Sequence, residues 1–384
     1  MLEQKTITGV AWNHRRCWGP LDAHAKKSAP DTGIHAQWNR RSLFSFGEGN
    51  LGDFVDANDL IIFDHPFSGD ASRQGLLLDF RNFLCHEDIE MLERNRVGKS
   101  YESYHFENGI WGLPIDTAAT VAAWRPDLLE NLSVKVPNTI GDVFELANFA
   151  RNQEKWIAWA AKPTDLFCTY MTMLASLEIE VGQLGTKFCP EDESAYIVDK
   201  MKELLKIVHP NSSSWNPIQL YSHMSNNDDV IYSPYAFNYV NYTSAKVRPL
   251  RFGTAPRMDQ DLPARGLLAG AGIGISAKSE NAKASFDYAM RLIDPQFQAT
   301  DYVANGGQPG MRSAWTSVEC NKMTNGFFSD CIQAVDTAFL RPNIPGFVDF
   351  FHLGTQRLAH VVYNDGNHLD FWQWLVASYA ELKG

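Results

Sequence analysis

GIWGLPIDTAATVAAWRPDLL, residues 109–129, is a mostly apolar stretch that ends the first third of the chain. The apolar residues from Gly109 to Pro114 predict a short buried strand, and Asp116 with Thr117 predicts a cap on the run that follows. A carboxylate just past a strand covered on both faces needs a polar partner. For Asp116 that partner is either a ligand hydroxyl or a helix N-terminus, and the sequence leaves both open. We interpret the stretch as a crossing between two lobes.

Length and composition limit the architecture. The chain has 384 residues, which is too long for one ordinary core and fits two lobes of roughly 150 to 200 residues. Its 11 Trp and 23 Phe either line a binding cleft or fill two cores. The formal net charge of −11 disfavours nucleic acid or an anionic membrane as a partner.

The cysteines and the start of the chain bear on the compartment. The six cysteines show no CxxC spacing, which disfavours a zinc or redox site. Cys320 and Cys331 are close in sequence, so either they form a disulfide or they are free buried thiols. No run approaches 18 apolar residues, so no transmembrane helix is predicted. The first residues enter a strand-like pattern without an apolar signal region, so either a signal peptide has been trimmed or the protein works in the cytoplasm.

The first 63 residues predict a parallel sheet. Strands are expected at residues 6–12, 34–38 and 59–63, separated by helices at 20–28 and 51–57. The third strand is uniformly apolar rather than alternating, as in a parallel strand covered on both faces. This order favours a βαβ arrangement.

Polar residues follow each of these three strands. Ligands of open α/β sheets bind beyond the carboxyl ends of the strands, so these residues are expected to gather on one rim. They are Asn13, His14 and Arg16 after the first strand, Arg40 and Ser42 after the second, and Asp64 and His65 after the third.

Later segments predict a second lobe and a return to the first. A capping box at Thr139 and Asp142 starts a helix, strands are expected at 156–160, 229–235 and 248–253, and helices at 86–96, 164–174, 191–208 and 369–382. Tyr235, Phe237 and Tyr239 belong to the densest aromatic group of the chain. Glycines 270, 272 and 274 have GxGxG spacing, which we interpret as close backbone packing rather than a dinucleotide site.

Catalytic motifs are not found. The sequence contains no GxSxG, GxxxxGK[ST] or HExxH, and the histidine spacings suggest no metal site. Asp64 and Asp116 remain a candidate pair of glycosidase carboxylates, because such a pair needs only to meet in space. We predict a protein that is not an enzyme and needs no cofactor or metal.

Two longer segments carry a family resemblance. Residues 110–139, IWGLPIDTAATVAAWRPDLLENLSVKVPNT, resemble the stretch in which extracellular solute-binding proteins of ABC importers cross to their second lobe. Residues 270–298, GAGIGISAKSENAKASFDYAMRLIDPQFQ, are similar to the returning strand and helix of that family, and residues 305–312 to its following glycine-proline crossing. The resemblance is to the carbohydrate-type branch, family 1, and covers nearly the whole chain in order.

The resemblance implies an α/β, two-lobe periplasmic-binding-protein-like fold of the class II type, with a ligand cleft between the lobes. Lobe one would comprise 1–114 and about 253–304, and lobe two about 115–252 and 305–384. It implies a monomer that captures a small sugar-like solute and delivers it to an ABC permease in the periplasm. The expected ligand-binding residues are Trp12, Asn13, His14, Arg16, Arg40, Ser42, Asp64, His65, Asp116, Tyr235, Phe237, Tyr239, Gln308 and Arg312.

Alternatives stay open at this stage. The arginines and histidines on the rim suggest a sugar acid or other anion as the solute, because the guanidinium fork suits a carboxylate. A cytoplasmic binder or sensor of the same fold is the second hypothesis, and a glycoside hydrolase is the third.

Overall fold

The computed structural model describes residues 4–179, 181–182, 185, 187–244 and 248–383. The chain forms two compact units, each assembled from three separate segments. Unit 1 consists of Met1–Ala118, Ala269–Ser329 and Pro342–Val348, and unit 2 of Ala119–Leu268, Asp330–Arg341 and Asp349–Gly384.

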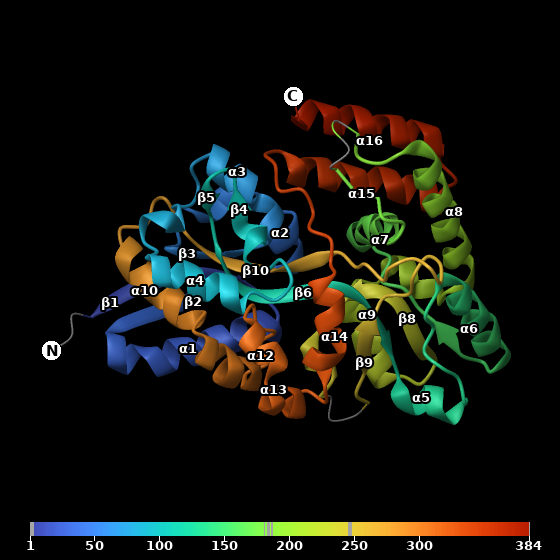
Figure 1. Cartoon of the computed structure of the whole chain (residues 1–384), viewed down its shortest axis with the longest axis horizontal. Helices are drawn as coiled ribbons and strands as arrows, with labels where there is room; N and C mark the ends of the chain where they lie inside the picture. Colours follow the sequence, from blue (N-terminus) through green and yellow to red (C-terminus); the bar gives the residue numbers. More distant parts are fainter. Residues whose placement is uncertain (1–3, 180, 183–184, 186, 245–247, 384) are drawn as a thin grey trace. The chain divides into compact units, whose positions relative to one another are not determined.

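Unit 1 contains the amino-terminal strands and the helices that cover them (Figure 1). Its elements are β1 (Lys5–Trp12), α1 (Arg15–Thr32), β2 (Ile34–Arg41), α2 (Leu43–Gly47), η1 (Leu51–Phe54), β3 (Leu60–Phe63), η2 (His65–Phe67), α3 (Ser68–Arg73), η3 (Phe80–Asn82), α4 (His86–Asn95), η4 (Glu102–Tyr104), β4 (His105–Phe106), β5 (Gly109–Ile110), the start of β6 (Leu113–Trp124), nearly all of β10 (Leu268–Ile275), α10 (Ala282–Leu292), α11 (Pro295–Phe297), the π-helical η7 (Gln298–Tyr302), α12 (Arg312–Thr316) and α13 (Val318–Met323).

Unit 2 contains the middle of the chain and its carboxyl-terminal helices. Its elements are the rest of β6, α5 (Pro126–Asn131), α6 (Ile140–Asn152), β7 (Trp156–Ile157), α7 (Pro163–Ser176), α8 (Glu191–Ile207), η5 (Pro210–Ser214), α9 (Pro217–Asn226), β8 (Val230–Phe237), η6 (Val240–Tyr242), β9 (Arg251–Thr254), most of α14 (Phe327–Asp336) and α15 (Phe347–Tyr363), and α16 (His368–Lys383).

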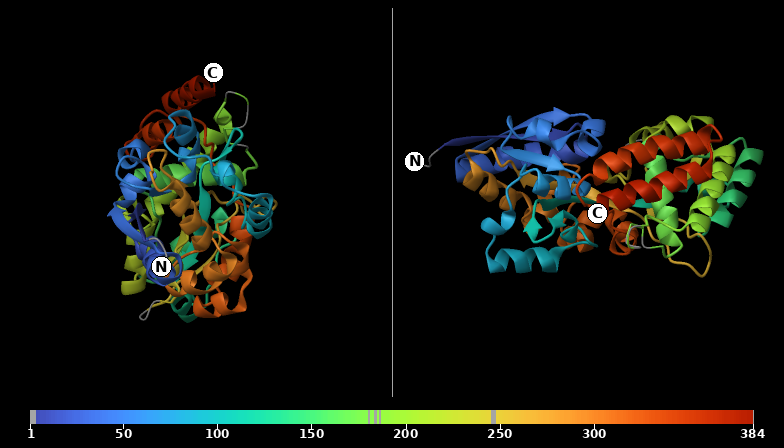
Figure 2. Two further views of the ribbon diagram at one scale, coloured as in Figure 1. Left: turned by 90° about the vertical axis from the view of Figure 1, so that its left-hand side faces the viewer. Right: turned by 90° about the horizontal axis from the view of Figure 1, so that it is seen from above.

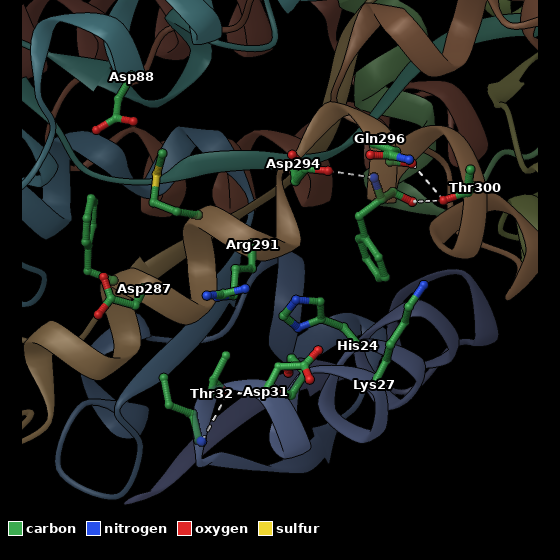
Figure 3. Close-up of a pocket in the computed structure, with 15 residues that line it drawn as sticks. His24, Lys27, Asp31, Thr32, Asp88, Asp287, Arg291, Asp294, Gln296 and Thr300 are labelled. Atoms are coloured by element: carbon green, nitrogen blue, oxygen red, sulfur yellow. Dashed lines mark hydrogen bonds between the residues drawn. The ribbon is translucent and has the colours of Figure 1, made fainter. Parts of the chain in front are cut away.

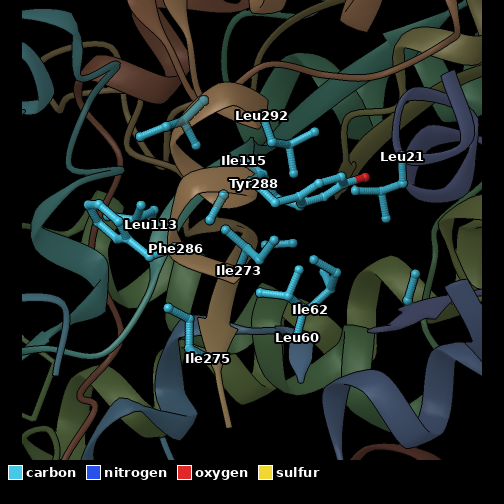
Figure 4. Close-up of a cluster of buried hydrophobic side chains, with 14 of the residues drawn as sticks. Leu21, Leu60, Ile62, Leu113, Ile115, Ile273, Ile275, Phe286, Tyr288 and Leu292 are labelled. Atoms are coloured by element: carbon cyan, nitrogen blue, oxygen red, sulfur yellow. The ribbon is translucent and has the colours of Figure 1, made fainter. Parts of the chain in front are cut away.

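The sheet of unit 1 is covered on both faces. β1 pairs with β2 and β3 in parallel, and β10 pairs with β3 in antiparallel. Along β3, Leu60 and Ile62 enter one hydrophobic cluster with α1 and α10 (Figure 4), whereas Ile61 and Phe63 enter another. Successive side chains of a strand point to opposite faces, so this division explains why β3 is uniformly apolar. The predicted parallel sheet is confirmed.

Helix α1 is longer than predicted. The sequence analysis began it at Pro20 and ended it before Pro30, but both prolines lie inside the helix. Its start is set by His14, whose side chain accepts a hydrogen bond from the Arg16 backbone N–H at 3.2 Å. Its end is set by Gly33, which has a left-handed φ of 71° and donates its backbone N–H to Ala29.

Strand β6 corrects the interpretation of residues 109–129. The predicted strand 109–114 is divided between β5, Gly109–Ile110, and the start of β6. The predicted cap lies within β6, a twelve-residue strand from Leu113 to Trp124 that contains Asp116. Eleven of its residues are buried. The run of Ala, Thr and Val is as compatible with a strand buried on both faces as with a helix, and tertiary packing selects the strand.

The segment 305–329 belongs to unit 1, whereas the sequence analysis placed it in the second lobe. Its attachment is polar: the Gly310 backbone N–H donates to Gln298 Oε1 at 2.8 Å, and the Met311 N–H donates to the same oxygen at 3.3 Å. Gln298 also donates to the Ile115 carbonyl oxygen at 3.3 Å. Residues 253–268, placed in lobe one from the sequence, lie in unit 2.

Unit 2 is built around the buried helix α7. β6 pairs with β8 and β9 in antiparallel, and β7 pairs with β8 in parallel. Every residue of α7 from Leu166 to Ser176 is buried. The helices α15 and α16 lie side by side in two views (Figures 1 and 2), where Phe350 and Trp374 stack with ring centroids 5.4 Å apart.

Two further expectations from the sequence concern disulfide bonds and membrane-spanning helices. All six cysteines lie in the described residues and none is bonded to another; Cys85 is exposed and the others are buried. No helix among the described residues is long and apolar enough to cross a membrane.

Candidate functional site

The carboxyl ends of three strands meet at one edge of the unit 1 sheet. In the parallel register, Trp12 of β1 lies opposite Arg41 of β2, and Val10 lies opposite Ile61 of β3. The Asn13 backbone N–H then donates to the Arg41 carbonyl oxygen at 2.7 Å. The predicted gathering of these strand ends is confirmed. Residues 12–16, 40–42 and 64–65 are named the carboxyl edge below.

A buried ion pair lies beside the carboxyl edge. Arg16 and Asp116 are 4% and 2% exposed. The Arg16 guanidinium donates two hydrogen bonds to the Asp116 carboxylate, one of them from Nε to Oδ2 at 2.7 Å. Burial raises the pKa of the Asp116 carboxyl, while the Arg16 charge opposes that shift. The structure gives Asp116 a guanidinium as its partner, which was not among the partners expected from the sequence.

Buried hydrogen-bonding groups without partners lie near this pair. The Trp12 ring packs at 4.6 Å on Phe46, and within the described part of the chain Trp12 Nε1 has no hydrogen-bond partner. The Tyr302 hydroxyl also has no hydrogen-bond partner among the described residues. Burial raises the pKa of this hydroxyl, and the nearby charge of Asp116 raises it further. Buried polar atoms are normally satisfied in proteins, so such a group marks a place where another molecule can bind.

Arg41 belongs to this edge but was not among the predicted residues. It is 7% exposed, its guanidinium lies 4.4 Å from the Phe54 ring centroid, and it donates to the Ile62 carbonyl oxygen at 2.7 Å. Burial lowers its pKa to about 10. Its neighbour Arg40 was predicted instead, and Arg40 is the exposed member of the two.

Other predicted residues of the carboxyl edge serve local structure. Asp64 accepts the His65 backbone N–H at 2.9 Å at the start of η2, and Ser42 accepts the Ser45 N–H at 3.0 Å at the start of α2. Arg40 is exposed, pairs with Asp22 at 3.1 Å and lies over the Trp18 ring. His14 caps α1, and burial followed by the Arg16 charge lowers its pKa to about 4. Asn13 is exposed.

The predicted residues at the last crossing also belong to unit 1. Gln308 is fully buried and donates to the Thr117 carbonyl oxygen at 2.7 Å, next to Asp116 in β6. Arg312 begins α12 and donates to the Arg96 carbonyl oxygen at 2.9 Å. Gln308 therefore lies beside the ion pair, whereas Arg312 is hydrogen-bonded to the loop after α4.

The glycines of β10 confirm the interpretation as close backbone packing. A Cβ at Gly270 would lie 2.2 Å from the Asp116 carbonyl oxygen, and the φ of 154° there disfavours a side chain as well. A Cβ at Gly272 would lie 2.4 Å from the Tyr104 ring.

The predicted residues of unit 2 form a separate aromatic group. Tyr235 is buried, and its hydroxyl donates a hydrogen bond to the Pro256 carbonyl oxygen at 3.4 Å. Burial raises the pKa of this hydroxyl. Tyr239 contacts Tyr221 edge to face, and Tyr221 in turn donates to the Phe237 carbonyl oxygen at 3.0 Å. A cavity of about 10 Å³, the size of one water, adjoins Tyr235 and Phe237.

The polar residues at that cavity, among them Thr120 and Asp165, were not predicted. Thr120 and Asp165 line it, and among the described residues Thr120 Oγ1 has no hydrogen-bond partner. No motif marks either residue in the sequence.

One group in unit 2 has the residue types of a metal site. His209, His223 and Asp229 bring their ligand atoms within 4.8 Å of one another. However, His209 Nδ1 accepts the Asn211 backbone N–H at 3.2 Å, which places the ring proton on Nε2, the atom facing Asp229. His223 Nε2 likewise lies 2.9 Å from Asp229. A metal-binding imidazole has the opposite arrangement, so we assign a hydrogen-bonded cluster.

Known proteins resemble this chain in structure but not in sequence. No protein-family model matches the sequence, and curated proteins give no match. Among solved structures, maltose-bound MalE3 of T. maritima has a TM-score of 0.81 at 15% identity, covering 98% of this chain and 99% of that one. A solute-binding protein of an ABC transporter from Agrobacterium radiobacter K84, in complex with ribitol, has a TM-score of 0.82 at 16% identity, covering 99% of both chains.

A third structure agrees with these two. The solute-binding protein of an ABC transporter from Thermotoga lettingae TMO, bound with α-D-tagatose, has a TM-score of 0.81 at 14% identity, covering 99% of this chain and 100% of that one. At these identities the similarity is one of fold. The chain therefore has the two-lobe α/β fold of these binding proteins, which confirms the fold that the sequence resemblance implied.

Proposed function

We propose that this protein is the solute-binding component of an ABC transporter and that it captures a small neutral sugar or polyol. The observation that carries the proposal is a buried donor at the carboxyl edge, Trp12 Nε1, which has no hydrogen-bond partner in the described part of the chain and whose ring packs on Phe46. The Tyr302 hydroxyl, on η7, is a second such group. A polyhydroxylated ligand supplies hydrogen-bond partners to such groups and lays its apolar face on rings. The structures with this fold include proteins bound to maltose, ribitol and tagatose.

The charges favour a neutral solute over the sugar acid considered from the sequence. Arg16 is engaged by Asp116, and Arg40 pairs with Asp22 at the surface. His14 has a pKa lowered to about 4 and is therefore neutral near pH 7. Three of the four side chains expected to attract an anion are thus occupied or uncharged, and the fourth, His65, has its Nδ1 atom 3.3 Å from Asp64 Oδ1.

The remaining parts of the proposal follow from this role. Tyr235, Phe237 and Tyr239 of unit 2 supply further contacts to the solute, and the other predicted ligand-binding residues of the carboxyl edge act mainly by shaping it. The protein works as a monomer outside the cytoplasmic membrane and delivers its solute to a permease. A sensor inside the cell is the alternative, and the absence of a permease gene beside this gene would favour it.

Binding without catalysis is the second half of the proposal. The candidate glycosidase pair was Asp64 and Asp116, and both hydrogen-bonding oxygens of Asp116 are taken by Arg16. A general acid must present its proton to the substrate, which this arrangement hinders.

The test is a thermal-shift screen against maltose, ribitol, tagatose and glucuronate, followed by calorimetric titration of each hit. A ligand at about 100 times its dissociation constant stabilises the fold by about 2.7 kcal/mol. We expect a neutral hit that is recovered unchanged. A hit that is consumed would establish a hydrolase, and glucuronate as the tightest ligand would overturn the neutral assignment.

A variant ties the hit to the carboxyl edge. Trp12→Phe keeps the ring packing on Phe46 and removes Nε1, and we expect about a five- to tenfold loss of affinity, the effect of one hydrogen bond. Trp374→Phe, in the stacked pair of unit 2, is the matched control. Equal affinities of the two variants would remove the carboxyl edge from the site.

A further inference from the structure

Unit 1 has a second concave site, at the opposite edge of its sheet from Trp12. A groove of about 890 Å³ lies between α1 and the α10–α11 segment, and Ile34, the first residue of β2, contributes to it. This volume is within the range of small-molecule sites, about 300 to 1,000 Å³. It is named the α1–α10 groove below, and its other principal residues are His24, Lys27, Ser28, Phe286, Met290, Arg291 and Phe297.

The floor of the α1–α10 groove holds two buried polar side chains. His24 and Ser28 are one helical turn apart on α1 and are 4% and 8% exposed. Among the described residues neither His24 Nδ1 nor Ser28 Oγ has a hydrogen-bond partner. In Figure 3 the His24 ring projects from α1 towards Arg291. Two adjacent unsatisfied groups at the floor of one groove indicate a place for a polar ligand atom.

Part of the lining of the groove is apolar, and aromatic rings pack around His24. The rings of Tyr288 and Phe297 meet the His24 ring edge to face at centroid distances of 4.5 and 4.8 Å. Phe286 is 8% exposed, and Met290 is half-buried beside it on α10. The groove therefore joins an apolar wall to a polar floor.

The charges near the floor are cationic. Burial, then Arg291, then Lys27 lower the pKa of His24 to about 4, which leaves its imidazole neutral near pH 7. Lys27 forms an ion pair with Asp301, whereas no ion pair of Arg291 is found within the described residues.

The carboxylates around the groove are mostly engaged elsewhere. Asp287 pairs with Lys283, Asp294 accepts the Phe297 N–H at 2.8 Å, and Asp88 accepts the Cys85 N–H at 3.0 Å. Asp31 is exposed at the rim. The backbone hydrogen bonds do not neutralise these groups, so four carboxylates contribute to the lining. Lys27 is paired with Asp301, and Arg291 is therefore the cation most available to a ligand.

We propose that the α1–α10 groove is a second binding site, for a small carboxylate with an apolar body. The apolar body packs on Phe286 and Met290, Arg291 pairs with the carboxylate, and the Ser28 hydroxyl and the neutral His24 ring donate hydrogen bonds to it. This site is independent of the carboxyl edge and of the sugar or polyol proposed there.

The experiment titrates the full chain with phenylacetate and follows the ring signals of ¹³C-labelled histidines by NMR. We expect the His24 signal, assigned with a His24→Gln variant, to shift saturably at millimolar phenylacetate. Phenylacetamide, which has the same shape without the charge, should bind about fivefold more weakly, the scale of one partly exposed ion pair. A His24 signal that phenylacetate does not move would overturn the proposal, and so would equal binding of the amide.

Variants separate the proposed contacts from a general charge effect. Arg291→Gln should weaken phenylacetate binding about fivefold, and Ser28→Ala should weaken it further when added. Arg94→Gln on α4 removes one exposed arginine paired with Glu90 and should leave binding unchanged. The same loss in Arg291→Gln and Arg94→Gln would contradict a specific site. Melting curves without ligand establish that each variant is folded.

Discussion

Arg16 of unit 1 and Arg125 of unit 2 are equally buried arginines with different partners. They are 4% and 1% exposed. Arg16 faces Asp116, whose side chain is 1% exposed, whereas Arg125 faces Asp127 and Asp228, whose side chains are 54% and 49% exposed. Arg125 also donates to the carbonyl oxygens of Met224 and Asn227 at 2.9 and 2.8 Å.

The difference shows that the partner determines what a buried arginine does. The pKa of Asp127 is lowered, chiefly by its hydrogen bond to Arg125, while burial raises the pKa of Asp116. Arg125 has several partners and fastens the end of β6 to the end of α9. The counter-charge of Arg16 is itself buried, so the removal of either member of the pair leaves the other charge in the interior with less compensation.

The largest expected effect is that of Asp116→Ala. It removes the buried carboxylate that the Arg16 guanidinium faces, and we expect a loss of about 3 to 5 kcal/mol in the free energy of unfolding. Urea denaturation at pH 7 measures it. A loss below about 1 kcal/mol would mean that Arg16 finds another partner and that the contrast with Arg125 is not real.

The double variant Arg16→Leu, Asp116→Leu is the control for this prediction. Because it removes both charges together, it should be more stable than Asp116→Ala. If the double variant is less stable than Asp116→Ala, the ion pair makes a net contribution to stability of its own. Its role is then more than avoiding an unpaired buried charge.

The second largest effect concerns the pH dependence of stability and contrasts a buried histidine of unit 1 with a histidine of unit 2. Unit 1 buries His24 among cations, with its pKa lowered to about 4, whereas unit 2 places His223 beside Asp229. Since the folded pKa is below the unfolded value near 6.5, the unfolded state binds the proton first and stability falls as pH drops from 6.5 towards 4. His24→Gln should abolish about 2 to 3 kcal/mol of the stability lost between pH 7 and pH 4.5.

Denaturation curves at the two pH values check this. His35→Gln changes an exposed histidine of β2 and is the matched control. An unchanged loss in His24→Gln would show that the acid sensitivity arises elsewhere.

The smallest effect is expected for Asp127→Asn. Asp127 is half-exposed, and Arg125 keeps Asp228 and two carbonyl oxygens, so the free energy of unfolding should fall by less than about 1 kcal/mol. The same denaturation assay applies. A loss as large as that of Asp116→Ala would show that burial of the arginine, and not of its partner, sets the cost.

Local patterns in the sequence predict much of this fold. The capping box at Thr139 and Asp142 is present, and Val143, Leu146 and Ala147 are buried on the predicted face of α6. The strand 59–63 was predicted within one residue of β3. These elements depend on neighbours within about one helical turn or on simple apolar runs, which a sequence displays directly.

The candidate site is less accessible to such reasoning. Arg16 and Asp116 are 100 residues apart, and only the meeting of β1, α1 and β6 makes them a pair. His209, His223 and Asp229 likewise come together without a motif. Where β6 was mistaken for a strand and cap, the run of small residues is compatible with either structure, and the choice depends on what packs against it.

The three-segment composition of unit 1 has a consequence for synthesis on the ribosome. Its last segment, Pro342–Val348, lies near the end of the chain and contributes Val348 to one of its hydrophobic clusters. The first strands therefore emerge long before the unit can be completed, and Leu60 and Ile62 of β3 lack the α10 side chains of their cluster until residue 292 has been translated. Domains usually fold as they emerge and exposed apolar strands aggregate, so the nascent chain of this protein should require a chaperone until nearly all of it has been translated.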